Sequence, residues 1–263
     1  MKEFIFSRLA SLYAISVVRY LFFAGGAYLL FYVLKRTKFW YLKIQDKYPD
    51  TARIKHEVSF SLLSMFVFAI IGVGVAVLKK LGYTQIYTTF SDYSIGYFIF
   101  TVLFLIFLHD TYFYWMHRAI HHKKVYRLVH KIHHVSTNPT PWAAFSFHPL
   151  EAVAEVAILP VFVFLLPLHP LAILAWLLFM TGMNVLGHLG FELFPKGFTT
   201  NRFTKLANTS VHHNMHHKYV NCNYGLYFNF WDRLMGTNHV NYDEEFETVV
   251  AKRATHLLAS EKS

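Results

Sequence analysis

The sequence predicts an all-α, polytopic integral membrane protein with a cytoplasm-facing, helical metal site built from histidine boxes, and three observations support this. Of the 263 residues, 55% are hydrophobic and only 15% are charged, whereas about a quarter of a soluble domain is charged. Several apolar runs approach or exceed the length of about 20 residues that a bilayer-spanning helix needs. Histidine occurs 17 times, and 14 of these residues lie between His109 and His217.

Charge and cysteine content exclude several classes of protein. The net charge is +10, which suits either nucleic acid or anionic lipid. The basic residues cluster beside apolar runs, as in segments that meet lipid head groups, so a membrane partner is expected and no nucleic acid. Cys222 is the only cysteine, so this chain cannot form an internal disulfide, a cysteine zinc finger or an iron–sulfur cluster by itself.

Five apolar runs organise the chain. The first, at about residues 12–34, is followed by the basic segment 35–38 and lacks a small-residue cleavage site, so we expect a retained helix and not a signal peptide. Arg19 lies inside it and either extends to the interface or faces the helix bundle. The later runs cover about residues 58–78, 97–115, 152–166 and 171–186. The last two are short and predict a helical hairpin that crosses obliquely or dips in and returns.

Loop charge predicts the orientation in the membrane. Seven cations lie between the first two runs, but only Lys79 and Lys80 lie between the second and third. The first loop should therefore be cytoplasmic, and the third span returns the chain to the cytoplasm just before His117. The fourth and fifth runs go out and back, so all the histidine clusters are expected near the cytoplasmic membrane surface. The N-terminus is then outside, despite Lys2 and Arg8.

Three histidine clusters repeat one spacing. Their members are His117 and His121, then His130, His133 and His134, then His213, His216 and His217. Residues three and four apart share a helix face, and no proline interrupts residues 111–138 or 196–235. Each cluster should aim its imidazoles in one direction, and eight imidazoles suffice for two metal ions. His188, at the end of the fifth run, could point into the same pocket.

Other polar residues could support these rings. Imidazole suits iron, copper, nickel and zinc, and an acid can orient a ligand ring by accepting its second N–H. The acidic candidates are Asp110, Glu151, Glu192 and Asp232. For His109, His122, His148 and His212, second-shell contact, pocket lining and no role all stay open. His56, His169, His239 and His256 are expected to be structural or solvated.

These motifs resemble the fatty acid hydroxylase/sterol desaturase superfamily over residues 108–237, about half the chain. The matching segments are His109-Asp110, 114–122, 130–134, 139–142, Phe147-His148-Pro149-Leu150-Glu151, Gly187-His188-Leu189-Gly190, 213–217, 223–225 and Phe230-Trp231-Asp232-Arg233. We therefore expect a single membrane domain over 1–263, with N-terminal transmembrane helices in 1–107, the catalytic region in 108–237 and a polar tail in 238–263.

The resemblance implies a di-iron oxidoreductase that hydroxylates or desaturates a lipid with O₂ and external electrons. The lipid would be fatty acyl, sterol-like or another isoprenoid. The box histidines and His188 would hold two Fe ions, for which zinc is a substitute that the ligand type does not exclude. Some fatty acyl hydroxylases have a further histidine four positions earlier, where this chain has Asn184. The resemblance is thus closer to the sterol desaturase branch, and Asn184 would act from the second shell through a water.

The sequence also bears on partners and on other functions. It contains no G-x-G-x-x-G fingerprint, cysteine cluster or covalent haem motif, so a separate electron donor is expected, such as a ferredoxin or a cytochrome b5-like protein with its reductase. A zinc-dependent hydrolase or isomerase could use the same ligands, although no H-E-x-x-H motif is present. A metal transporter would place its ligands at mid-span, whereas these clusters lie at span ends.

Overall fold

The computed structural model describes the backbone of residues 1–260 and the side chains of residues 1–252. Helices dominate, and the described residues contain no strand, only three isolated β-bridges. This confirms the all-α prediction.

Within residues 1–260, four helices are long and apolar enough to cross a membrane, and they match four of the five apolar runs. They are Lys2–Leu34, α3 (Thr51–Lys80), α4 (Ile95–Ile120) and α9 (Pro170–Gly187). The first comprises α1 (Lys2–Tyr20), η1 (Leu21–Gly25), α2 (Gly26–Tyr28) and η2 (Leu29–Leu34), of which η1 and η2 are π-helical. Side chains define where two of these helices begin, because Asp50 accepts the Arg53 N–H and Ser94 accepts the Tyr97 N–H.

The remaining run, at 152–166, is interrupted. It forms α7 (Pro149–Val156) and α8 (Ile158–Leu165), each of eight residues and too short to cross a bilayer. Pro160 explains the break at Ala157, since it cannot donate a hydrogen bond to the carbonyl of Val156 and its ring crowds that group. Residues 166–169 then connect α8 to α9. The expected hairpin is therefore present, and its first helix is interrupted at Ala157.

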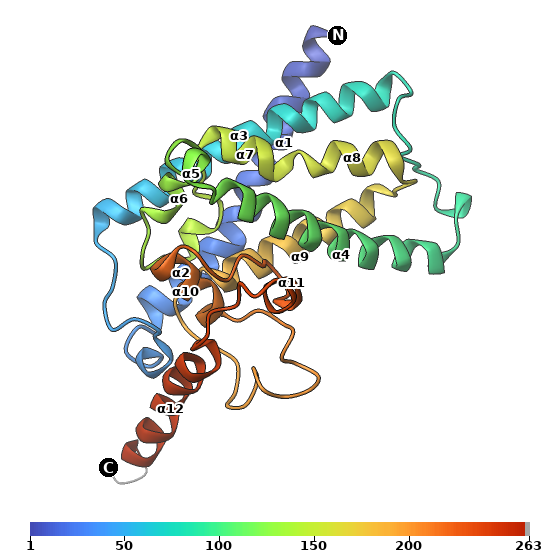
Figure 1. Cartoon of the computed structure of the whole chain (residues 1–263). Helices are drawn as coiled ribbons and strands as arrows, with labels where there is room; N and C mark the ends of the chain where they lie inside the picture. Colours follow the sequence, from blue (N-terminus) through green and yellow to red (C-terminus); the bar gives the residue numbers. More distant parts are fainter. Residues whose placement is uncertain (261–263) are drawn as a thin grey trace.

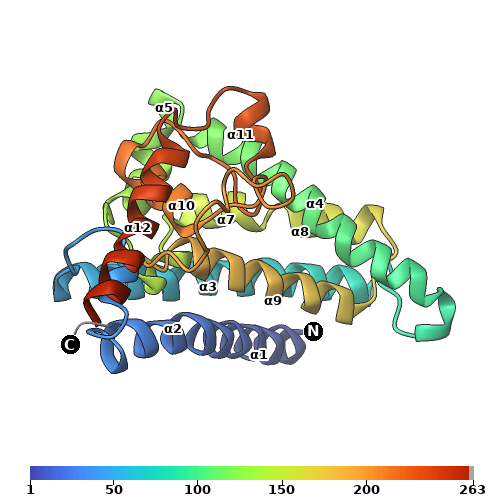
Figure 2. The same ribbon diagram turned by 90° about the horizontal axis from the view of Figure 1, so that it is seen from below.

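The helices are arranged in layers (Figures 1 and 2). Figure 2 shows α1 and α2 on one face, α3 and α9 in the middle, and α4, α7 and α8 beyond them. Tyr20, Met65 and Val185 join the first two layers in one apolar cluster with Phe145 and Phe147. Gly72 permits a close approach of α1 and α3, because an added Cβ there would lie 3.0 Å from a methyl group of Leu12.

The remaining α-helices lie against this stack, with α5, α10 and α12 at one end of it (Figure 2). They are α5 (Lys123–Val129), α6 (Lys131–His134), α10 (Ser210–Tyr219), α11 (Phe230–Leu234) and α12 (Tyr242–Ser260). Tyr242 and Phe246 of α12 are buried against Val211 and Met215 of α10. The C-terminal helix therefore supports the helix that carries the third histidine cluster.

Candidate metal centre

Helix ends bring the histidine clusters together. His117 lies in the last turn of α4, and His121 is the residue that ends this helix. His130 joins α5 to α6, and His188 ends α9. The third cluster lies on α10, which begins where the Thr209 side chain accepts the His212 N–H and ends at Val220, whose φ is 69°.

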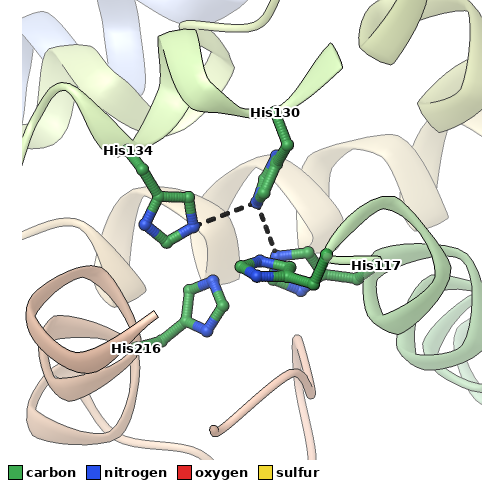
Figure 3. A group of neighbouring side chains, drawn as sticks. His117, His130, His134 and His216 are labelled. Atoms are coloured by element: carbon green, nitrogen blue, oxygen red, sulfur yellow. Dashed lines mark hydrogen bonds between the residues drawn. The ribbon is translucent and has the colours of Figure 1, made fainter. Parts of the chain in front are cut away.

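Five of these imidazoles form a first buried group, called here the five-histidine group: His117, His121, His130, His134 and His216. One ligand atom from each lies within 4.8 Å of the others. The Nε2 atom of His130 is 3.0 Å from that of His117 and 3.1 Å from that of His134. Figure 3 shows four of these rings turned toward a common space between α4, α6 and α10.

The other four imidazoles form the four-histidine group: His133, His188, His213 and His217. The Nε2 atom of His188 lies 2.9 Å from that of His213 and 3.3 Å from those of His133 and His217. The two groups adjoin, because the ring centres of His134 and His217 are only 4.9 Å apart. Together the groups contain all nine of the predicted ligands.

Five rings have their Nδ1 atom facing an oxygen acceptor. Glu151 Oε1 faces Nδ1 of His130 at 2.6 Å, and the other four acceptors are the backbone carbonyls of Tyr224, Ser146, Asn184 and Cys222, opposite His117, His133, His188 and His216 respectively. A carbonyl or carboxylate must receive a proton, so Nδ1–H is the donor in each contact. Nε2 is then left with its lone pair, as metal ligation requires.

Burial also favours the neutral, ligating form. Burial, and after it the neighbouring histidines, lower the pKa of the eight ligand imidazoles outside the membrane-spanning helices, to about 3 for His134 and about 4 for His188. Nε2 of His216 and both ring nitrogens of His121 are buried without a hydrogen-bond partner in the described structure. Such atoms are costly unless something binds them, and sets of four and five imidazoles fit two ions of iron, zinc or a related metal.

Two of the residues predicted to support the ligand rings contact them. Glu151, on α7, is fully buried and receives the His130 Nδ1–H. Asn184 accepts the His188 Nδ1–H through its backbone carbonyl at 2.8 Å, while its side chain donates to the Ala144 carbonyl. Its contact with the site is therefore direct and uses a backbone atom.

The other three acids bind backbone N–H groups. Asp232 accepts from Tyr224 and Gly225, and Tyr224 supplies the carbonyl that faces His117. Asp110 accepts from the Tyr227 N–H at 2.7 Å. Glu192 accepts from the N–H of Val211 in the first turn of α10 at 3.0 Å, and from that of Phe194. These carboxylates hold the segments around the site.

Three further histidine candidates lie outside both groups. His109 Nδ1 is 2.8 Å from the Tyr227 hydroxyl. His148 caps α7 by accepting the N–H of Leu150. His212 is buried with its Nε2 3.6 Å from Asp232 Oδ2. None of them belongs to either group of convergent nitrogens.

An apolar cavity lies beside the ligands. It contains about 800 Å³ of unfilled space, part of it open to the surroundings, between α1, α3, α4, α7, α8 and α9. Four of its lining residues also line a smaller space against the histidine rings: Phe113, Phe147, Glu155 and Asn184. Sequence analysis missed Glu155, although its position four residues after Glu151 on an apolar helix places both acids on one face.

Known proteins with similar sequences include lipid-oxidising enzymes. Residues 102–237 match the fatty acid hydroxylase family. Lathosterol oxidase of Homo sapiens is 27% identical over 218 residues, which cover 81% of this chain and 71% of the relative. Delta(7)-sterol 5(6)-desaturase of Leptosphaeria maculans is 34% identical over 232 residues, covering 87% of this chain and 60% of the relative. No solved structure matches the chain.

Proposed function

The chain belongs to the fatty acid hydroxylase family, and we propose that it is a multi-pass membrane di-iron oxidoreductase that hydroxylates or desaturates a lipid with O₂. The observation that carries this proposal is the meeting of nine buried imidazoles in two adjoining groups. Two groups of this kind suit two metal ions, and their neutral nitrogen ligands suit iron. The proposed ligands are those nine histidines, with Glu151 and Asn184 as residues that orient their rings.

Iron bound by these groups would supply the redox chemistry that activates O₂ and oxidises a C–H bond of the lipid. The residues of the chain do the rest. In five of the nine rings an Nδ1–H donor holds the ring with Nε2 toward the metal. The aromatic side chains Phe113 and Phe147, which lie between the apolar cavity and the ligands, exclude water from the reacting carbon.

The electrons are proposed to come from a separate protein, a ferredoxin or a cytochrome b5-like protein with its reductase. An exposed basic surface beside the site supports this, and we call its four residues the α5 basic surface: Lys123, Lys124, Arg127 and Lys131. It lies between His121 and His133 in the sequence. A surface of this charge favours docking of an acidic donor.

The metal site is proposed to face the cytoplasm, with the catalytic region in 108–237. The support is the loop charge, with seven cations between the first two spans against two between the second and third.

Comparative lipid mass spectrometry tests the proposal. Cells that express this chain should contain a lipid that has gained one oxygen atom or lost two hydrogen atoms, and cells that express His216→Ala should not. The same product in both would contradict an oxidation at this site. A hydrolysed or isomerised lipid, formed without O₂, would point to zinc chemistry instead.

A further inference from the structure

Arg19 lies within the apolar run of the first helix that could span a membrane. It follows Leu12, where this run begins, by seven residues, which is roughly 10 Å of helix at 1.5 Å per residue. An arginine at this depth either extends to the membrane surface or faces the helix bundle. The surroundings of its side chain decide between these two destinations.

That destination is the apolar cavity beside the metal ligands. Leu12, Ser16 and Arg19 line it together, since residues spaced by four and three share a helix face. Most of the remaining wall is apolar, with Phe68, Phe145 and Trp176 among its members.

The guanidinium of Arg19 has no protein partner in this cavity. Its Nε atom is buried without a hydrogen bond, and none of the ion pairs among the described side chains includes Arg19. Of the side chains that the structure describes, Glu155 is the one acid that lines the cavity, and no ion pair joins it to Arg19. Arginine keeps its charge in proteins, and a buried charge is costly unless an opposite charge meets it. The site is therefore complementary to an anion.

We propose that this cavity is the substrate chamber, and that Arg19 selects a lipid whose head group is an anionic oxygen group, a carboxylate or a phosphate monoester. The inference rests on the proposed function, because the chamber adjoins the histidine ligands through Phe113, Phe147 and Asn184. The planar guanidinium fork binds either anion with two parallel hydrogen bonds. The lipid chain lies along the aromatic and aliphatic wall.

A structural role for Arg19 makes a different prediction from a binding role. A structural arginine loses contacts when it is replaced, so Arg19→Met would lower the melting temperature of the protein. A ligand-binding arginine without protein partners loses none, and Arg19→Met then leaves the melting temperature unchanged or raises it. Arg19→Lys keeps the positive charge but loses the planar guanidinium, so it should retain only part of the preference for an anionic lipid.

Binding of three lipids with the same acyl chain tests the proposal on the purified full chain. The probes are oleate, oleoyl lysophosphatidate and oleyl alcohol. The wild type should bind at least one acidic probe roughly tenfold or more tightly than the alcohol, and the preferred acid identifies the head group. Arg19→Met should lose this difference. Arg8→Gln, which changes an exposed arginine of the same helix, should keep it.

Three results would overturn the proposal: equal binding of acid and alcohol by the wild type, the same preference in Arg19→Met, or no binding of any probe. His216→Ala separates this inference from the proposed function. It should lose lipid oxidation and keep the preference for acidic lipid, so either claim can fail alone.

Discussion

The Nδ1 atom of His130 lies 2.6 Å from Oε1 of Glu151, and both side chains are buried. This contact leaves Nε2 of His130 facing His117 and His134 within the five-histidine group. A carboxylate on the far side of a ligand ring fixes its tautomer and raises its basicity. The spacing of the histidines predicts His130 as a ligand, whereas the fold of residues 141–156 brings Glu151 against its ring.

Glu151→Ala is expected to weaken metal binding by about 10- to 100-fold, the usual effect of losing such a partner. Titration of the purified, metal-loaded protein with a chelator measures this change. Glu155→Gln is the matched control for metal retention, because this glutamate lies on the same helix and no hydrogen bond among the described residues joins it to a ligand ring. Retention equal to the wild type in Glu151→Ala would show that the contact does not support a ligand.

Lys43 should make stability depend on pH. Its side chain is fully buried, with Nζ 3.2 Å from the Gly190 carbonyl oxygen, and burial lowers the pKa of this amine to about 8. Between pH 8 and about 10.5 the unfolded chain keeps a proton that the folded chain has lost. The free energy of unfolding therefore rises with pH in this window, by up to about 3 kcal/mol in total.

Thermal unfolding at several pH values checks the prediction for Lys43. Lys43→Met should abolish the rise between pH 8 and 10, whereas Lys38→Met, an exposed lysine of the same loop, should retain it. An identical slope in the wild type and Lys43→Met would assign the pH dependence to another group.

Charge reversal on the α5 basic surface should weaken use of the electron donor. Lys124→Glu with Arg127→Glu is expected to raise the KM for a reduced acidic donor roughly tenfold at low salt and much less at high salt, because salt screens exposed charges. Turnover with a small chemical reductant should not change. The control is Lys80→Glu, which changes an exposed lysine at the end of α3 and should leave the KM for the donor unchanged. An unchanged KM in the Lys124→Glu, Arg127→Glu variant as well would place docking on another surface.

The ligands could be predicted from sequence, but their supports could not. Histidines such as His213 and His217 share a helix face by spacing alone, and that pattern requires no knowledge of the fold. Most of the groups that accept the Nδ1–H of a ligand ring are backbone carbonyls, including those of Ser146 and Cys222. Every residue has a backbone carbonyl, so the sequence does not identify which of them accept. Their positions depend on loops whose course is set by tertiary packing.

Two other features of the structure could not be predicted from the local sequence pattern. The apolar run 152–166 predicts one span, and only the backbone chemistry of Pro160 accounts for the break between α7 and α8. The sequence alone allows the Arg19 side chain either to extend to the membrane interface or to face the helix bundle. In the folded chain, Arg19 lines the cavity that residues of α3 and α9 also line.

Metal content and O₂ uptake of the purified chain show whether these nine histidines form an oxidising metal centre. We expect two ions per chain, with O₂ consumed when these are iron. His133→Ala and His216→Ala, one from each group, should lose both metal and O₂ uptake. His122→Ala, an exposed neighbour outside both groups, should behave as the wild type. Wild-type metal content and O₂ uptake in both ligand variants would contradict the assignment of these histidines to an oxidising metal centre.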